Sequence, residues 1–237
     1  GIPVWGAGAM QVGGAVQREQ IEQALADQGG AYQRLRRIMD AWCALWFWPL
    51  TQESVQPPTM AEWIDALQML LGRHQGKAKN QGGNQTLAAG TSWDELGDYE
   101  ALDLGFASAM PIDLILARHP WLRVCEQVAA QQGFFHWELD FATIFAHGGF
   151  DLQVGNPPWV RPIYDADALL AEGDPWWQLA LRPSESLRAV KRAETLAIPG
   201  IPELVMDGAT DVAAMAAFAG SAQQYPYLTG LQPDLYR

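Results

Sequence analysis

The sequence is poor in cysteine, in basic residues and in long apolar runs. Its two cysteines, Cys43 and Cys125, stand apart in apolar helical patterns without the paired spacing of a zinc site, which predicts reduced, buried thiols in a cytoplasmic protein. The four histidines show no ligand spacing either, so we expect no metal. No stretch reaches the roughly 18–20 apolar residues that cross a bilayer, and this predicts a chain without membrane spans.

Basic residues are outnumbered in this chain of 237 residues. Lysine and arginine total 15 against 27 aspartates and glutamates, which gives a formal net charge of −12. A surface this acidic does not bind DNA or an anionic membrane by bulk electrostatics. Apolar residues make up 49% of the chain, which is enough to bury a core.

Residues 1–132 have a mainly helical pattern. Apolar residues recur at three- and four-residue spacing between residues 31 and 48, and Thr59 with Glu62 forms the signature of a capping box before another amphipathic helix. Residues 74 to about 98 hold almost nothing that could be buried and predict a mobile surface loop. Two short helices broken at Pro120 are expected between residues 111 and 132.

Residues 133–237 begin with a different pattern. The segment 134–137 is short, aromatic and bounded by glycine, as in a strand; a short helix follows, and residues 150–155 form a second strand candidate. A strand, a short helix and a second strand ending at a rigid polar turn predict an α/β sheet. Helices are then expected at residues 165–171, 174–181, 184–196 and 202–222.

The second strand candidate leads into the most informative string of the chain, Phe150-Asp151-Leu152-Gln153-Val154-Gly155-Asn156-Pro157-Pro158-Trp159-Val160. This string resembles the catalytic motif of amino-group DNA methyltransferases, in which Asn, Asp or Ser is followed by two prolines and an aromatic residue at the end of a sheet strand. With Asn first and Trp last, it is most similar to the N6-adenine branch. The preceding run from His136 to Phe141 extends the resemblance to large restriction-modification methylases of the type IIG kind and to related methylases of phage-defence systems.

The resemblance implies a fold, a cofactor and a site. The fold would be α/β, part of a Rossmann-like class I methyltransferase sheet, with residues 1–132 as a large, mainly helical insertion and residues 133–237 as the catalytic-strand part followed by helices. The cofactor would be S-adenosyl-L-methionine and the partner DNA. The catalytic residues would be Asn156, Pro157, Pro158 and Trp159.

These residue types suit the chemistry of an adenine amine, whose lone pair is delocalised into the ring. A catalyst can help by accepting hydrogen bonds from both amine hydrogens; by the family's roles, the Asn156 side-chain oxygen and the Pro157 carbonyl would do so in a proline-stiffened turn. Trp159 would stack on the base, which has to leave the duplex. Such stacking contributes about 1–3 kcal/mol per base and offsets part of the cost of unstacking.

The motif and its neighbours also admit structural interpretations. The Asn156-Pro157-Pro158 string could be a plain strand-ending turn, with Trp159 packed in a core. Asp151 could act structurally at the start of the strand. The pair Trp176-Trp177 could form a wall of the DNA channel or be one buried and one partly exposed residue. Arg161 could meet a phosphate or a surface acid.

A complete cofactor motif is missing from the sequence. A glycine-rich turn after an early strand is expected for S-adenosylmethionine, yet residues 5–10 have glycines without a strand, and residues 102–108 have an acid and one glycine. We therefore expect the cofactor-binding half upstream of Gly1 in a longer parent chain, with a target-recognition region after Arg237, and the fragment alone to be inactive. Residues 37–49 also resemble a segment found between those motifs in the large methylases.

The leading hypothesis is the central part of an S-adenosylmethionine-dependent DNA methyltransferase that modifies the N6 amine of a flipped adenine, in restriction-modification or phage defence. The same motif also serves methyltransferases that act on RNA or on a protein glutamine, and this is one alternative. The other alternative is a non-catalytic helical interaction module, in which the many tryptophans make the core.

Overall fold

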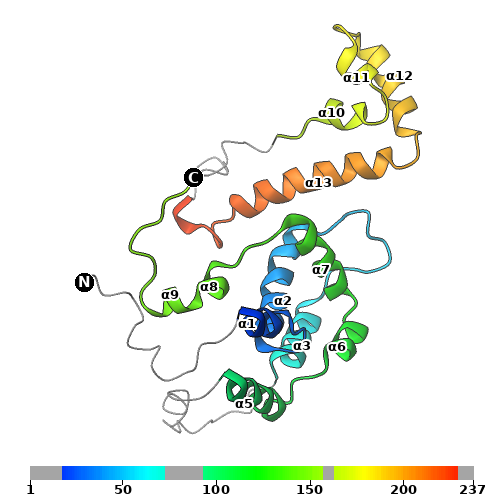
Figure 1. The fold of residues 1–237 in the computed structure, drawn as a ribbon. Coiled ribbons are helices and arrows are strands. Elements are labelled where there is room, and N and C mark those ends of the chain that lie inside the picture. The colour runs from blue at the N-terminus through cyan, green and yellow to red at the C-terminus, as the bar shows by residue number, and fades with distance from the viewer. Residues whose placement is uncertain (1–17, 73–92, 157–162, 229–237) are drawn as a thin grey trace. The chain divides into compact units, whose positions relative to one another are not determined.

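The computed structural model describes residues 18–72, 93–156 and 163–228 and shows a mainly helical chain (Figure 1). These residues group into two compact units that interleave along the sequence. The first unit contains the described residues of Gly1–Ala41, Pro58–Glu126 and Phe135–Ala142; the second contains those of Trp42–Pro57, Gln127–Phe134 and Thr143–Arg237. Each unit buries apolar side chains of its own.

The predicted α/β sheet is wrong, because the part of the chain that the structure describes contains no β-strand. The first strand candidate is irregular up to His136 and then forms a single helical turn, α8 (Trp137–Asp140). The second, residues 150–156, has no regular structure. A strand exists only where a neighbouring strand accepts and donates its backbone hydrogen bonds, and the helices around these segments offer no such edge. A Rossmann-like class I sheet is therefore not the fold of the described residues.

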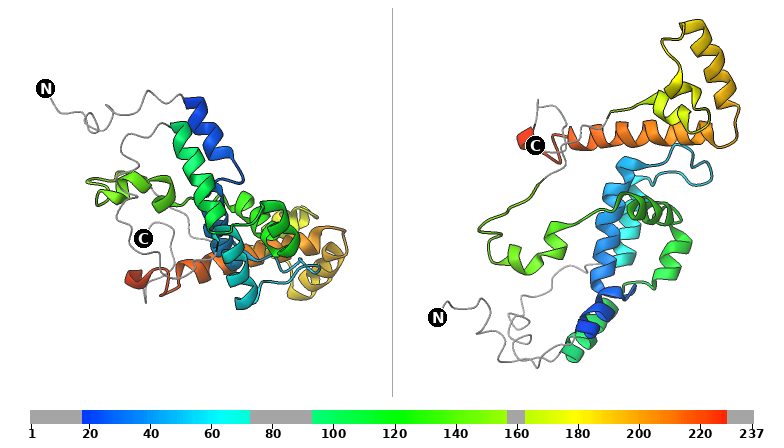
Figure 2. Two further views of the ribbon diagram at one scale, coloured as in Figure 1. Left: turned by 90° about the horizontal axis from the view of Figure 1, so that it is seen from below. Right: turned by 45° about the horizontal axis from the view of Figure 1, so that its top comes forward.

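Among the described residues, the first unit contains five complete helices and the first part of two more that continue into the second unit. Two of them, α1 and α5, lie side by side in both views of Figure 2. The bounds are α1 (Arg18–Ala26), α2 (Ala31–Ala44), α3 (Met60–Leu71), α5 (Trp93–Phe106), α6 (Ile112–Arg118), α7 (Trp121–Gln132) and α8. The predicted break at Pro120 is confirmed, because it separates α6 from α7.

The core of the first unit lies where α3 packs against α6. The predicted capping box is present: the Glu62 backbone N–H donates to Thr59 Oγ1 over 3.3 Å, and Glu62 Oε2 accepts from the Thr59 N–H over 2.7 Å. This capping box fixes the start of α3, so that Ala66 and Leu70 of the helix face inward. The buried residues of these helices and of α7 include Ala66, Leu70, Ile115, Leu116, Leu122 and Cys125.

Both cysteines are free thiols, as the sequence predicts. Cys125 is fully buried on α7, whereas Cys43 is half-buried. Burial raises the pKa of Cys125 to about 12, because a thiolate would lose its hydration there. The thiol therefore remains protonated at neutral pH and behaves as a small core residue.

Arg34 is a buried cation that joins three segments of the first unit. Its Nη1 donates to the carbonyls of Leu70, 2.9 Å away in the last turn of α3, and of Met110, 3.0 Å away. Its Nε donates to the carbonyl of Gly29 over 2.6 Å. The last carbonyls of a helix lack partners within the helix, and the guanidinium supplies one here. Burial lowers the pKa of Arg34 and the neighbouring Arg37 lowers it further, yet a guanidinium stays charged in proteins.

Replacement of Gly72 by alanine is expected to destabilise the protein by about 2–4 kcal/mol, since left-handed strain and overpacking each cost about 1–3 kcal/mol. Gly72 ends α3 with a φ of 86°, and an added Cβ would overlap the Ala107 carbonyl, whose carbon is only 2.7 Å away. Thermal or urea unfolding measures the change. Gly105→Ala on α5 is the matched control, because no atom lies within 4 Å of its added Cβ. Equal stability of the two variants would contradict this account.

The expected loop at residues 74 to about 98 is wrong at its end, because α5 begins at Trp93. Glutamate, leucine and alanine residues at 95–96 and 100–102 favour a helix, and a segment poor in apolar periodicity can still form an exposed one. The remainder of that loop lies outside the described residues. The division into a helical insertion up to residue 132 and a catalytic part after it stays a prediction.

The second unit contains the remaining helices, and the predicted ones are confirmed with shifts of a few residues. They are η1 (Leu45–Phe47), α9 (Ala142–Ala146), α10 (Ala166–Ala171), α11 (Trp176–Leu179), α12 (Glu185–Leu196), α13 (Ile201–Ala219) and η2 (Pro226–Leu228). Asp165 caps α10 and Ser184 caps α12 by accepting backbone N–H groups three residues ahead. These caps explain why the starts of α10 and α12 can be predicted from the sequence.

The second unit packs around α13. Leu170, Trp177 and Ile201 form a buried cluster between α10, α11 and α13. At the other end of α13, Phe218 meets the two aromatic rings of η1, at 5.9 Å from Trp46 and 6.1 Å from Phe47 between centroids. Aromatic rings make up the second contact, whereas the first combines Trp177 with aliphatic side chains.

Candidate catalytic segment

Asn156 is the one predicted catalytic residue that the structure describes. It stands at the end of residues 150–156, an exposed segment without regular structure. Leu152 and Val154 in this segment are 78% and 86% exposed. Pro157, Pro158 and Trp159, as well as Arg161, lie outside the described residues. The structure therefore leaves the assembled geometry of the four-residue motif as a prediction.

A double glycine closes the helix before this segment. The N–H of Gly148 donates to the Phe145 carbonyl and that of Gly149 to the Ile144 carbonyl, over 3.1 and 3.0 Å, which caps the end of α9. The φ angles of 102° and 98° at these glycines are ones that other residues rarely adopt. Phe145 and Phe150 then meet edge to face across the cap, with centroids 5.8 Å apart. Seven residues lead from this cap to Asn156.

The run from His136 to Phe141 is attached to α2 by polar contacts. His136 is buried, and its Nε2 lies 2.7 Å from Asp40 Oδ1. Asp140 Oδ1 accepts from the Tyr32 hydroxyl, also over 2.7 Å. Arg36 lies between the two contacts, because its Nη1 donates to the Tyr32 oxygen over 3.2 Å and its Nε is 3.6 Å from Asp40 Oδ2. None of these three α2 side chains was predicted from the sequence to be functional, although Asp40 lies within the segment 37–49.

A signal for these residues was present in the sequence. Tyr32, Arg36 and Asp40 follow one another at four-residue spacing, so they share one face of a helix, and His136 and Asp140 have the same spacing. That spacing identifies two polar faces. It does not say that the two faces meet, because they are about a hundred residues apart in the chain.

Aromatic rings gather beside these polar contacts on α8. Phe135, Trp137 and Phe141 form a cluster with centroids 5.4–5.8 Å apart. Phe135 is 54% exposed and Trp137 41% exposed. The buried His136 and the half-buried Asp140 thus contact α2, whereas Phe135 and Trp137 leave an accessible aromatic surface.

The sequence left two roles open for the pair Trp176-Trp177, a wall of the DNA channel or a structural role, and the structure favours the structural one. Trp177 is buried and donates from Nε1 to Thr195 Oγ1 over 3.0 Å, while Trp176 is half-buried. The Arg188 guanidinium lies 5.2 Å above the Trp177 ring. A wall of a DNA channel would need accessible rings, so this pair is best understood as part of the core. Asp151 is exposed at the start of its segment.

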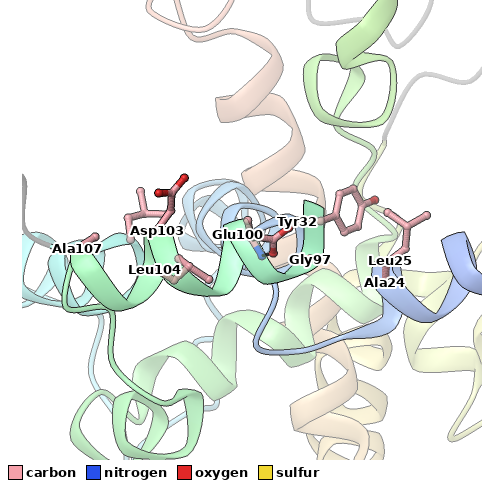
Figure 3. Close-up of a pocket in the computed structure, with 10 residues that line it drawn as sticks. Ala24, Leu25, Tyr32, Gly97, Glu100, Asp103, Leu104 and Ala107 are labelled. Carbon is pink, nitrogen blue, oxygen red and sulfur yellow. Dashed lines mark hydrogen bonds between the residues drawn. The ribbon is translucent and has the colours of Figure 1, made fainter. Parts of the chain in front are cut away.

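The two candidate cofactor segments differ in what the structure says of them. Residues 5–10 lie outside the described residues. Residues 102–108 belong to the end of α5 and the turn after it, and Asp103 lines a cavity of about 740 Å³ in the first unit. Figure 3 shows Gly97, Glu100, Leu104 and Ala107 along one face of α5, with Tyr32 and Leu25 at one end.

This cavity does not fit S-adenosylmethionine. The charged residues among those lining the cavity, Glu100 and Asp103, are both acidic and could face the sulfonium or ammonium group of that cofactor, but no cationic side chain among them faces its carboxylate. Glu100 is already engaged, because its Oε1 accepts from the Ala31 N–H. A glycine-rich turn that follows a strand is absent here, since the segment is helical. No step of a methyl transfer is therefore assigned to these residues.

Neither a membrane-spanning helix nor a cluster of metal ligands occurs among the described residues. No helix there is both long and apolar enough to cross a membrane. No group of three or more histidine, cysteine, aspartate or glutamate side chains within residues 18–72, 93–156 and 163–228 is arranged to hold a metal ion.

Residues 96–171 match the model of the Eco57I restriction-modification methylase family, which corresponds to about a third of the chain. The match runs from α5 to α10 and includes α8, Asn156 and the motif that follows it. It supports a relationship to restriction-modification methylases, and so to DNA methyltransferases. Neither the curated proteins nor the solved structures contain a similar chain.

Proposed function

We propose that this chain carries the catalytic segment of an S-adenosylmethionine-dependent DNA methyltransferase that modifies the N6 amine of adenine in restriction-modification or phage defence. The observation that carries the proposal is the family match over residues 96–171, which includes the string from Asn156 to Trp159. The accessibility of Asn156 supports it, because an amide that serves a substrate must be reachable.

The mechanism follows from the chemistry of an aromatic amine. The Asn156 side-chain oxygen and the Pro157 carbonyl accept one hydrogen bond each from the two amine hydrogens, which localises the nitrogen lone pair toward the methyl donor. Pro158 restricts the turn that holds both acceptors. Trp159 stacks on the flipped base and offsets part of the cost of removing it from the duplex.

The remaining requirements are assigned to other parts of the protein. S-adenosylmethionine would supply the methyl group, and the helical segment 102–106 lacks the glycine-rich turn expected of its binding site. We propose, as the resemblance implies, that a longer parent chain provides the cofactor-binding and target-recognition regions. The net charge of −12 supports this division, because a DNA-binding surface needs positive charge that this chain has little of. We propose a cytoplasmic location for the enzyme.

Two alternatives remain alongside this proposal. The same motif serves methyltransferases that act on RNA or on a protein glutamine. A non-catalytic interaction module is favoured by one specific observation, the exposure of Leu152 and Val154 in a segment that no sheet covers. Such a module would use its apolar surface for a partner and would not depend on Asn156.

Mass spectrometry of nucleosides and peptides separates these candidates. The intact protein encoded by the gene is expressed in a host without adenine methylation, and its DNA, RNA and proteins are digested and compared with those of the empty host. We expect N6-methyladenine in DNA alone. Methylated RNA bases or methylglutamine would show that RNA or protein, and not DNA, is the substrate. The absence of modification in every fraction would favour the interaction module.

A further inference from the structure

We propose that the cavity beside α5 in the first unit is the docking site for a basic amphipathic helix of a partner protein. The cavity measures about 740 Å³, and ligand sites generally measure about 300–1,000 Å³. Its lining residues come from α1, α2, the end of α3, and α5 with the turn after it, and all of them belong to the first unit. The inference goes beyond the proposed function and does not depend on it, because it concerns no residue of the catalytic segment.

The cavity follows one face of α5 (Figure 3). Its lining residues on this face are spaced three or four positions apart and are Gly97, Glu100, Leu104 and Ala107. The Ala107 N–H still donates to the Asp103 carbonyl over 2.9 Å, so the last helical turn includes this residue. From the first to the last of these residues the helix axis rises about 15 Å, which is nearly three turns. The cavity is therefore long enough for contact along a second helix.

The lining of the cavity combines small residues with accessible apolar ones. Four of its ten residues are glycine or alanine, which leaves room for the backbone of a second helix. Leu25 and Leu71 are 41% and 45% exposed, and Leu104 is half-buried. Single exposed leucines are ordinary on a protein surface, but these three line one cavity. The apolar face of an amphipathic helix would bury them together, as in helix-in-groove recognition.

Two acidic residues at the cavity indicate that the partner is basic. Glu100 and Asp103 are both exposed. Glu100 is held in place, because its Oε1 accepts from the Ala31 N–H at the start of α2, where a negative charge is favourable. The Asp103 carboxylate has no hydrogen bond or ion pair within the part of the chain that the structure describes. It is therefore available to a lysine or arginine on the docking helix.

The helices around the cavity concentrate the negative charge of the chain. Five acidic residues and no basic residue give α5 a formal charge of −5, and two acids with one arginine give α1 a charge of −1. These two helices lie side by side and carry half of the net charge of −12. Such a surface repels nucleic acid and attracts a lysine- or arginine-rich segment. A basic helix thus matches the cavity in charge as well as in shape.

The test is the binding of a labelled synthetic helix to the intact protein, measured by fluorescence anisotropy. The probe has about 15 residues, with leucine on one helical face and lysine on both sides of it. We expect saturable binding. Asp103→Asn should weaken it about two- to fivefold, as expected for one exposed ion pair. Asp98→Asn is the matched control, because it removes the same charge from an exposed residue of α5 that does not line the cavity.

A second pair of variants tests the cavity itself. Gly97→Leu places a large side chain in the cavity and should weaken binding at least about tenfold, because a filled site cannot accept the helix. Gly105→Leu is its control: Gly105 lies on α5 outside the cavity lining, and neither glycine has an atom within 4 Å of an added Cβ, so both variants should fold. Circular dichroism checks that their unfolding temperatures agree.

The outcomes that would overturn the inference are distinct from those that concern methylation. Full binding by Gly97→Leu, or equal losses in Asp98→Asn and Asp103→Asn, would show that the peptide is attracted by net charge alone. Equal binding of a probe with glutamate in place of lysine would overturn the basic character of the partner. Binding of hexylamine with the same dependence on Gly97 would replace the helix by a small cationic ligand. None of these measurements requires an active methyltransferase.

Discussion

Replacement of Asn156 by alanine is expected to abolish DNA methylation by the intact enzyme while leaving its folding nearly unchanged. The amide oxygen that would orient the adenine amine is lost, and removal of one preorganised polar group from a reacting centre costs at least about a hundredfold in rate. Asn156 is exposed, so its truncation should change the free energy of unfolding by no more than about 0.5 kcal/mol. Methylation rate and thermal unfolding, measured on the same preparation, test both halves of this expectation.

Two further substitutions sharpen the Asn156 experiment. Asn156→Asp keeps an oxygen acceptor at the same position, so it should retain more activity than the alanine variant. Gln153→Ala is the matched control, because Gln153 is an exposed amide in the same segment, three residues earlier. An alanine variant at position 156 that methylates DNA at the unmodified rate would contradict the catalytic assignment and favour the interaction module.

Replacement of Arg34 by methionine is expected to destabilise the first unit by about 3–5 kcal/mol, because loss of hydrogen bonds from a charged group costs about 1.5–3 kcal/mol each and the bonds are not additive. Methionine preserves much of the length and the apolar stem but removes all three donations, to the carbonyls of Gly29, Leu70 and Met110. These carbonyls would remain beside an apolar side chain without their present donor. Urea unfolding followed by circular dichroism measures the loss.

Arg123→Met provides the control for Arg34. Arg123 also belongs to the first unit, but it is exposed on α7, so the same chemical change should alter stability by less than about 0.5 kcal/mol. Comparable losses in the two variants would show that the three carbonyl contacts of Arg34 do not stabilise the fold.

The sequence by itself determined the features that depend on neighbouring residues. The Thr59–Glu62 capping box, the caps at Asp165 and Ser184 and the break at Pro120 each act within one helical turn, so their residue types are sufficient to place helix starts and ends. The motif around Asn156 could likewise be recognised from the sequence, because such a turn needs particular residues in direct succession. The family match over residues 96–171 includes that string.

Only the tertiary structure decided which segments meet. The residues around Phe134 and Phe150 have the composition of strands, but strand formation requires a hydrogen-bonding partner that composition does not supply, and no described segment provides one. The contacts of Arg34 with Leu70 and Met110, and of Asp40 with His136, join residues 36, 76 and 96 positions apart. Their energy depends on burial and on geometry between distant segments. For this reason the sequence predicted Asn156 as a functional residue but did not predict the contacts of α2 with His136 and Asp140.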